Sequence, residues 1–183
     1  MIDRNVWSVR LVSVAIGVIL LAFIAVLATR ESGDGTASKS PLIGQLVPKV
    51  TGESLNGTNF DVDDFYNRWV LVNFFASWCV PCVREHPQLA EWQARNKEKG
   101  IVISIPFGDT EEDVRDFFDE HGGGWPVLMD QDAAWAVAFG VLRPPESFLV
   151  SPGGTVVAKW QGQITADEVD RGVSDLELKV GDQ

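Results

Sequence analysis

The feature that most constrains the fold is an uninterrupted apolar run that leads straight into a pair of cysteines. Residues 69–75 read WVLVNFF, with β-branched and aromatic residues and no polar alternation. Such a run is typical of a central strand that is buried on both faces of an α/β sheet. We expect a helix to begin at Cys79 and to stop at Gly100, because glycine is favoured just beyond a helix end. A strand followed directly by a helix predicts an α/β domain.

The remainder of the chain continues this alternation. His121 follows Val114 and Phe117 at helical spacing, so we expect it to pack at a helix end and not to bind a ligand. The sequence predicts a hairpin turn at Asn56-Gly57 and strands at 101–106, 127–129, 148–150 and 155–160. It also predicts a short helix from Asp61 to Phe65, a helix capped by Thr110 and a short helix at 133–139. A Thr165/Glu168 capping box begins the last predicted helix.

A long apolar segment near the N-terminus predicts a membrane anchor. Residues 11–28 are eighteen uncharged, almost wholly apolar residues, which as a helix would extend about 27 Å. Arg4 and Arg10 precede this segment, so the positive-inside rule makes residues 1–10 a cytoplasmic N-terminus. We therefore expect a single-pass anchor in the cytoplasmic (inner) membrane, with the rest of the chain in the periplasm or extracytoplasmic space. A signal peptide cleaved after Ala28 is the alternative.

Composition characterises the chain beyond the anchor. Residues 29–40 are polar and contain Gly and Ser, which predicts a flexible tether, and residues 41–183 form the folded domain. A net charge of −11 with scattered acidic residues leaves no basic patch, which excludes nucleic-acid binding. A hydrophobic content of 45% excludes a disordered chain, and two cysteines are too few to staple a small domain.

The only two cysteines, Cys79 and Cys82, form a C-x-x-C motif. Cys79 is placed where a strand ends and a helix begins, so unpaired backbone N–H groups and the positive helix dipole stabilise its thiolate. We expect Cys79 to be the nucleophile. Cys82, one turn further, is expected to resolve the mixed disulfide and to form the redox-active Cys79–Cys82 bond. This chemistry needs no other cofactor.

Three other uses of the cysteine pair compete with this chemistry. Covalent haem attachment needs a histidine directly after Cys82, where this chain has Val83. A zinc site would need His86 and His121 as well, and nothing in the sequence places His121 near the cysteines. A purely structural disulfide across so short a loop would constrain little of the unfolded chain. We therefore expect no metal at the pair.

Three parts of the chain together resemble a known family. They are Trp78-Cys79-Val80-Pro81-Cys82 with Arg84-Glu85-His86-Pro87, Ser40 to Gly44 with Val47-Pro48, and Gly140-Val141 with Pro145 to Phe148. These segments are similar to those of the membrane-anchored thioredoxin-like proteins of cytochrome c maturation, the DsbE or CcmG type within the TlpA and ResA group. The resemblance implies a thioredoxin fold, with a mixed central sheet between helices and an insertion over about 110–140. It also implies that Pro145 is a cis-proline facing the disulfide.

Two departures from the family pattern bear on the site. Asn73 occupies the buried position where thioredoxin has an aspartate, so Glu146 and Glu85 are the candidates for proton handling. We favour Glu146 and expect Glu85 to be solvated at the surface. Pro144, the residue before Pro145, has no N–H to donate to a substrate backbone. Docking is then expected to rest on shape, with Trp78 in the docking groove.

The resemblance implies an extracytoplasmic thiol-disulfide oxidoreductase that reduces the cysteines of apocytochrome c, or of a haem-lyase-associated thiol protein, before haem attachment. Its electrons would come from a membrane thiol transporter of the DsbD or CcdA type. Two alternatives stay open. The protein could serve other secreted thiol proteins as a reductant or an oxidant, or it could be a copper-binding chaperone that uses Cys79, Cys82 and His86.

Overall fold

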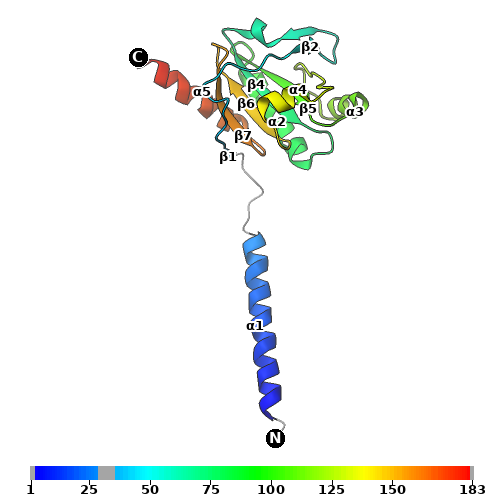
Figure 1. The fold of residues 1–183 in the computed structure, drawn as a ribbon, viewed down its shortest axis with the longest axis vertical. Helices are drawn as coiled ribbons and strands as arrows, with labels where there is room; N and C mark the ends of the chain where they lie inside the picture. The colour runs from blue at the N-terminus through cyan, green and yellow to red at the C-terminus, as the bar shows by residue number, and fades with distance from the viewer. Residues whose placement is uncertain (1–2, 29–35, 182–183) are drawn as a thin grey trace. The chain divides into compact units, whose positions relative to one another are not determined.

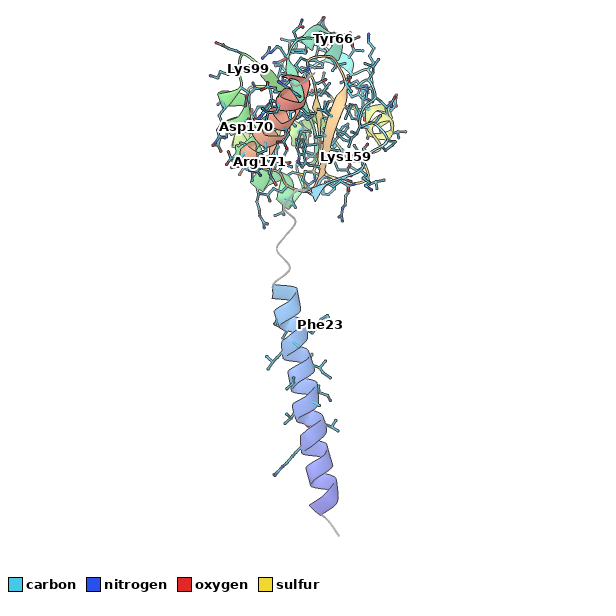
Figure 2. The ribbon with its side chains drawn as sticks, turned by 90° about the vertical axis from the view of Figure 1, so that its left-hand side faces the viewer. Phe23, Tyr66, Lys99, Lys159, Asp170 and Arg171 are labelled. Atoms are coloured by element: carbon cyan, nitrogen blue, oxygen red, sulfur yellow. A yellow bond between two sulfur atoms is a disulfide. The ribbon has the colours of Figure 1, made fainter. Side chains whose placement is uncertain are left out.

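The computed structural model describes residues 3–28 and 36–181, and the chain divides into two units, Met1–Asp34 and Gly35–Gln183. The first unit contains one helix, α1 (Asp3–Ala28), whose large apolar side chains from Val12 to Ile24 are exposed, as Phe23 illustrates in Figure 2. Within the described residues, no helix combines the length and apolar character needed to cross a membrane. The predicted span at 11–28 is thus not confirmed.

A five-stranded mixed sheet, with strand order β1-β7-β6-β4-β5, organises the second unit (Figure 1). β4 and β5 are parallel, whereas β6 is antiparallel to β4, and β7 is antiparallel to β6. A separate two-stranded hairpin joins β2 to β3. The strands are β1 (Thr36–Ala37), β2 (Thr51–Glu53), β3 (Asn59–Asp61), β4 (Trp69–Phe75), β5 (Gly100–Pro106), β6 (Glu146–Val150) and β7 (Val156–Gln161).

The central strand β4 is buried along its whole length, which confirms the prediction from its apolar run. Alternate residues of a strand point to opposite faces of the sheet. On one face of β4, Val70, Val72 and Phe74 pack with Phe139 of α4 (Ala134–Phe139). Leu71 on the other face packs with residues of α2 (Val80–Arg95) and of α5 (Ala166–Gly181). The domain is therefore a sheet with helices on both faces, as predicted.

The helix that carries the cysteines ends earlier than predicted. Cys79 is the N-cap of α2, but the C-cap is Asn96, whose backbone and side-chain N–H groups both donate to the Trp92 carbonyl. Gly100 is not a helix-ending residue; it is the first residue of β5. Glycine is needed there because a Cβ atom would lie 2.6 Å from the Trp92 ring.

The other predicted elements are present, with one exception. Asp61 caps η1 (Val62–Phe65), Thr110 caps α3 (Glu111–His121), and the Thr165 N–H donates to Glu168 Oε2 at 2.7 Å at the start of α5. The predicted strand at 127–129 is wrong. Only Val127 forms a β-bridge, to Ser104 of β5. Pro126, which precedes it, has no N–H to extend a ladder.

The sheet begins before residue 41, where we placed the start of the folded domain. Thr36 and Ala37 form β1 and pair with Gln161 and Trp160 at the edge of β7. The Ser38 N–H also donates to the Lys159 carbonyl at 2.9 Å. The last residues of the predicted tether are thus part of the sheet and cover its edge. Residues 29–35 of that tether lie outside the described residues.

Candidate redox site

The two cysteines lie at the start of α2, just beyond the carboxyl end of β4. They form a disulfide, and the residues are 5% and 2% exposed. The Cys82 N–H donates to Cys79 Sγ at 3.3 Å. In the reduced protein, this N–H and the positive end of the helix dipole would stabilise a Cys79 thiolate. Pro81 sits in the first turn of α2, where a missing N–H leaves no helical bond unmade.

Apolar side chains surround the disulfide. Val114 and Phe117 of α3, together with Val127, pack with both cysteines in one buried cluster. Trp78 and Val80, which flank Cys79 in the sequence, are instead 63% and 59% exposed. A polypeptide that approached Cys79 would meet these two exposed side chains, so Trp78 is available for the docking role we predicted.

The loop before β6 lies at the same end of the sheet as the disulfide. Phe74, one residue from the end of β4, pairs with Glu146, the first residue of β6. The cysteine-bearing turn and residues 140–145 therefore leave adjacent strands at the same edge. The Pro144–Pro145 peptide bond is cis, as the resemblance implied. The topology thus brings Pro145 to the end of the sheet that carries the cysteines.

This loop has no backbone donor left for a partner chain. The N–H groups of Leu142 and Arg143 donate to Glu146 Oε1 at 3.0 and 3.3 Å. Pro144 and Pro145 have no N–H. The backbone of the loop therefore offers an approaching polypeptide only carbonyl acceptors. This extends the expectation drawn from Pro144 alone.

Glu146 forms a buried ion pair with Lys159 of β7. Figure 2 labels Lys159. Glu146 Oε2 lies 2.7 Å from Lys159 Nζ, and the two side chains are 1% and 6% exposed. Lys159 also donates to the Gly140 carbonyl at 3.3 Å. The Glu146 carboxylate is thereby committed to holding the loop before β6, and its proton-handling role stays a prediction. Our sequence reasoning missed Lys159, whose only signal is a lysine with apolar residues on both sides in a strand.

Glu85 is fully buried, so the expectation that it is solvated at the surface is wrong. Its Oε2 accepts a hydrogen bond from Asn73 Nδ2 at 3.2 Å, and its Oε1 accepts one from the Ile164 N–H at 3.1 Å. Asn73 also donates to Ser147 Oγ at 3.0 Å. Burial raises the pKa of Glu85 from 4.5 to about 8 and outweighs the hydrogen bonds, which lower the pKa. The carboxyl group, one helical turn after Cys82, is therefore mostly protonated at neutral pH.

His86 lies in an aromatic cluster. Its Nε2–H donates to the Gly122 carbonyl at 2.8 Å, and its ring centroid lies 5.0 Å from those of Phe117 and Trp125. Burial lowers the pKa of His86. His121 packs against Phe117, with ring centroids 4.7 Å apart, as predicted for the helix end. Among the described residues, no three His, Cys, Asp or Glu side chains are grouped to hold a metal ion, so the copper alternative gains no support from geometry.

Fold and site together define the class. A disulfide that begins a helix after a central strand, with a cis-proline loop at the same sheet edge, is the arrangement of a thioredoxin-like thiol-disulfide oxidoreductase. The Redoxin family model matches residues 42–177. The chain belongs to the Redoxin family.

Two relatives with similar sequences are named for thiol-disulfide chemistry. Thiol-disulfide oxidoreductase ResA of Bacillus thuringiensis subsp. konkukian is 29% identical over 154 residues, which are 84% of this chain and 89% of the relative. The thiol:disulfide interchange protein DsbE homolog of Paracoccus denitrificans is 33% identical over 138 residues, 74% of this chain and 75% of the relative.

Two solved structures have a fold similar to that of this chain. The thioredoxin domain of a thiol-disulfide oxidoreductase from Bacteroides vulgatus has a TM-score of 0.66 at 25% identity, over 75% of this chain and 99% of that one. A thioredoxin family protein from Chlorobium tepidum also has a TM-score of 0.66, at 23% identity, over 75% of this chain and 97% of that one. The protein is therefore a thiol-disulfide oxidoreductase with a thioredoxin fold.

Proposed function

We propose that this enzyme reduces the cysteines of apocytochrome c, or of a haem-lyase-associated thiol protein, before haem attachment. The observation that carries the proposal is the buried Cys79–Cys82 pair at the start of α2, within a motif that resembles those of cytochrome c maturation proteins. A membrane thiol transporter of the DsbD or CcdA type supplies the electrons. A general reductant or an oxidant would use the same site and would differ in its partner or in the direction of electron flow.

The reaction proceeds by two thiol-disulfide exchanges. The Cys79 thiolate attacks one sulfur of the substrate disulfide, forms a mixed disulfide and releases the other substrate sulfur as a thiolate. The Cys82 thiolate then attacks Cys79 Sγ, which releases the remaining substrate thiolate and closes the Cys79–Cys82 bond. Two electrons pass from the cysteine pair to the substrate, and the thiol transporter returns them by the reverse exchanges.

We propose that Glu85 exchanges a proton with Cys82. Cys82 is buried and must lose its proton before it attacks the mixed disulfide. A buried carboxyl group three residues further along α2 lies on the same helix face. The pKa of Glu85 is about 8, so a minor fraction of the carboxyl group is ionised at neutral pH, and this fraction can accept the proton that Cys82 loses. The hydrogen bonds from Asn73 and Ile164 hold the carboxyl group in place.

The roles of the two cysteines predict different trapped products. Cys82→Ser should accumulate mixed disulfides with substrate through Cys79, because attack still occurs while resolution is lost. Cys79→Ser should accumulate far fewer, because Cys82 is buried within the helix. Non-reducing gels of material purified from cells would compare the two variants. Equal trapping by both variants would contradict the assignment of Cys79 as the nucleophile.

The direction of electron flow is tested in cells. Trapping the thiols with an alkylating agent should find Cys79 and Cys82 largely as the dithiol, because the transporter keeps the enzyme reduced. Deletion of the protein should lower holocytochrome c, and an added small-molecule thiol should restore it. A pair found mainly as the disulfide, with cytochromes unaffected by deletion, would favour the oxidant alternative and leave the oxidoreductase activity intact.

We also propose that the N-terminal segment holds the domain at the cytoplasmic membrane, with the cysteines on its outer side. Support comes from the exposed apolar side chains of α1 and from Arg4 and Arg10 before the apolar run. The protein should stay with membranes through a carbonate wash and keep its N-terminus. A mature protein that begins at Thr29 would show instead that the segment is a cleaved signal peptide.

A further inference from the structure

We propose that Asp109 is a positioning residue for the redox reaction, because its carboxylate clamps Ser77 and so holds Cys79 Sγ close to the Cys82 N–H in the first turn of α2. Asp109 lies between β5 and α3, and it acts through Ser77 on the turn that leads into the cysteine motif. Neither residue was singled out from the sequence. The inference goes beyond the choice of substrate, since it applies to any thiol-disulfide exchange at this site.

The clamp consists of two hydrogen bonds from one residue to one carboxylate. The Ser77 N–H donates to Asp109 Oδ2 at 2.6 Å, and Ser77 Oγ donates to Asp109 Oδ1 at 2.9 Å. Hydrogen bonds to an ionised acceptor are shorter and about twice as strong as neutral ones. Ser77 lies two residues before Cys79, and the Cys79 N–H donates to the Ala76 carbonyl at 3.1 Å. The turn is thus held at two consecutive residues, Ala76 and Ser77.

The segment that carries Asp109 is itself fixed. The Phe107 N–H donates to the Phe75 carbonyl at 2.8 Å, which ties the end of β5 to the end of β4. Gly108 then adopts a φ of 62°, a left-handed conformation that glycine reaches without steric cost and that turns the chain. Thr110, directly after Asp109, caps α3. Asp109 therefore connects the cysteine turn to the base of the helix that covers the disulfide.

Position matters here because the Cys79 sulfur depends on one short-range contact. The Cys82 N–H lies 3.3 Å from Cys79 Sγ, and hydrogen bonds weaken steeply as distance and angle depart from the optimum. Trp78, between Ser77 and Cys79, is mostly exposed and adds little packing to hold the turn. Asp109 also has an opposite effect, because a nearby carboxylate charge disfavours a thiolate. Two substitutions separate the positioning effect from the charge effect.

Asp109→Asn keeps a hydrogen-bond acceptor for Ser77 and removes the charge, whereas Asp109→Ala removes both. Relative to Asp109→Asn, we expect Asp109→Ala to raise the pH midpoint of Cys79 alkylation in the reduced full-length protein. Alkylation at pH 7 should be about threefold to tenfold slower, because less of the thiol is ionised. The equilibrium of the Cys79–Cys82 pair with glutathione should shift toward the disulfide by a similar factor, since a less stabilised thiolate disfavours the reduced form.

Two further variants make the test decisive. Glu112→Ala removes an exposed carboxylate from the first turn of α3 and should change neither measurement. Ser77→Ala keeps the backbone bond and loses only the hydroxyl bond, so it should show a smaller effect in the same direction. It also replaces Asp109→Ala if that variant does not fold. The proposal is overturned if Asp109→Ala matches Asp109→Asn or, where Asp109→Ala does not fold, if Ser77→Ala matches the wild type, in alkylation midpoint and glutathione equilibrium, even where these variants lower the urea midpoint.

Discussion

Glu85→Gln should remove most of the loss of stability that the wild-type protein shows between pH 5 and pH 8. Burial raises the pKa of Glu85 from 4.5 to about 8. Between these values the folded carboxyl group keeps a proton that the unfolded chain has released. The free energy of unfolding of the wild type should therefore fall, by up to about 1.4 kcal/mol per pH unit, as the pH rises through this window. Glutamine resembles the protonated acid in shape but does not titrate.

The measurement is urea unfolding of the oxidised protein at intervals of half a pH unit. Near pH 5 the wild type and Glu85→Gln should agree within about 1 kcal/mol, because both are uncharged at this position. At pH 8 the variant should be more stable by several kcal/mol. Glu112→Gln, an exposed carboxylate on α3, is the matched control and should retain the wild-type slope. Parallel curves for wild type and Glu85→Gln would show that the folded carboxyl group is already ionised.

The parts of the fold that local pattern specifies were predicted from the sequence. The apolar run of β4, the caps at Thr110 and Thr165 and the cysteine pair at the start of α2 each depend on residues within one or two turns. The predicted end of α2 was wrong because it also relied on local sequence pattern alone. Gly100 looked like a helix-ending residue, but its size is required by the Trp92 ring, and this contact forms only when α2 packs on the sheet. A tertiary contact decided that boundary.

The polar network of the site could not be predicted because most of its pairs join segments that are distant in the sequence. Glu85 is buried by the segment around Ile164, which follows β7. Asp109 reaches Ser77 across 32 residues of sequence. In the sequence, both acids occur in stretches rich in charged residues, where a solvated surface is the ordinary expectation. The residues that form the disulfide were predictable, whereas those that hold and tune it were not.

Lys159→Met should be among the most destabilising single changes outside the apolar core. The lysine and Glu146 are almost fully buried, and their charged atoms lie 2.7 Å apart. Removing the lysine leaves a buried carboxylate whose remaining partners are the N–H groups of Leu142 and Arg143. Breaking one side of a buried ion pair costs about 3–5 kcal/mol. Urea unfolding at neutral pH would measure this loss.

The double variant Lys159→Met with Glu146→Gln tests whether the loss of stability comes from the Lys159–Glu146 ion pair itself. Glutamine keeps an acceptor for the two loop N–H groups and has no charge to strand, so the double variant should recover most of the stability lost in Lys159→Met. Lys99→Met, at an exposed lysine labelled in Figure 2, is the control and should change stability by less than about 0.5 kcal/mol. If the effects of the two single substitutions simply add, the ion pair does not couple them. In that case Lys159 stabilises β7 through its aliphatic stem and its contact with the Phe148 ring.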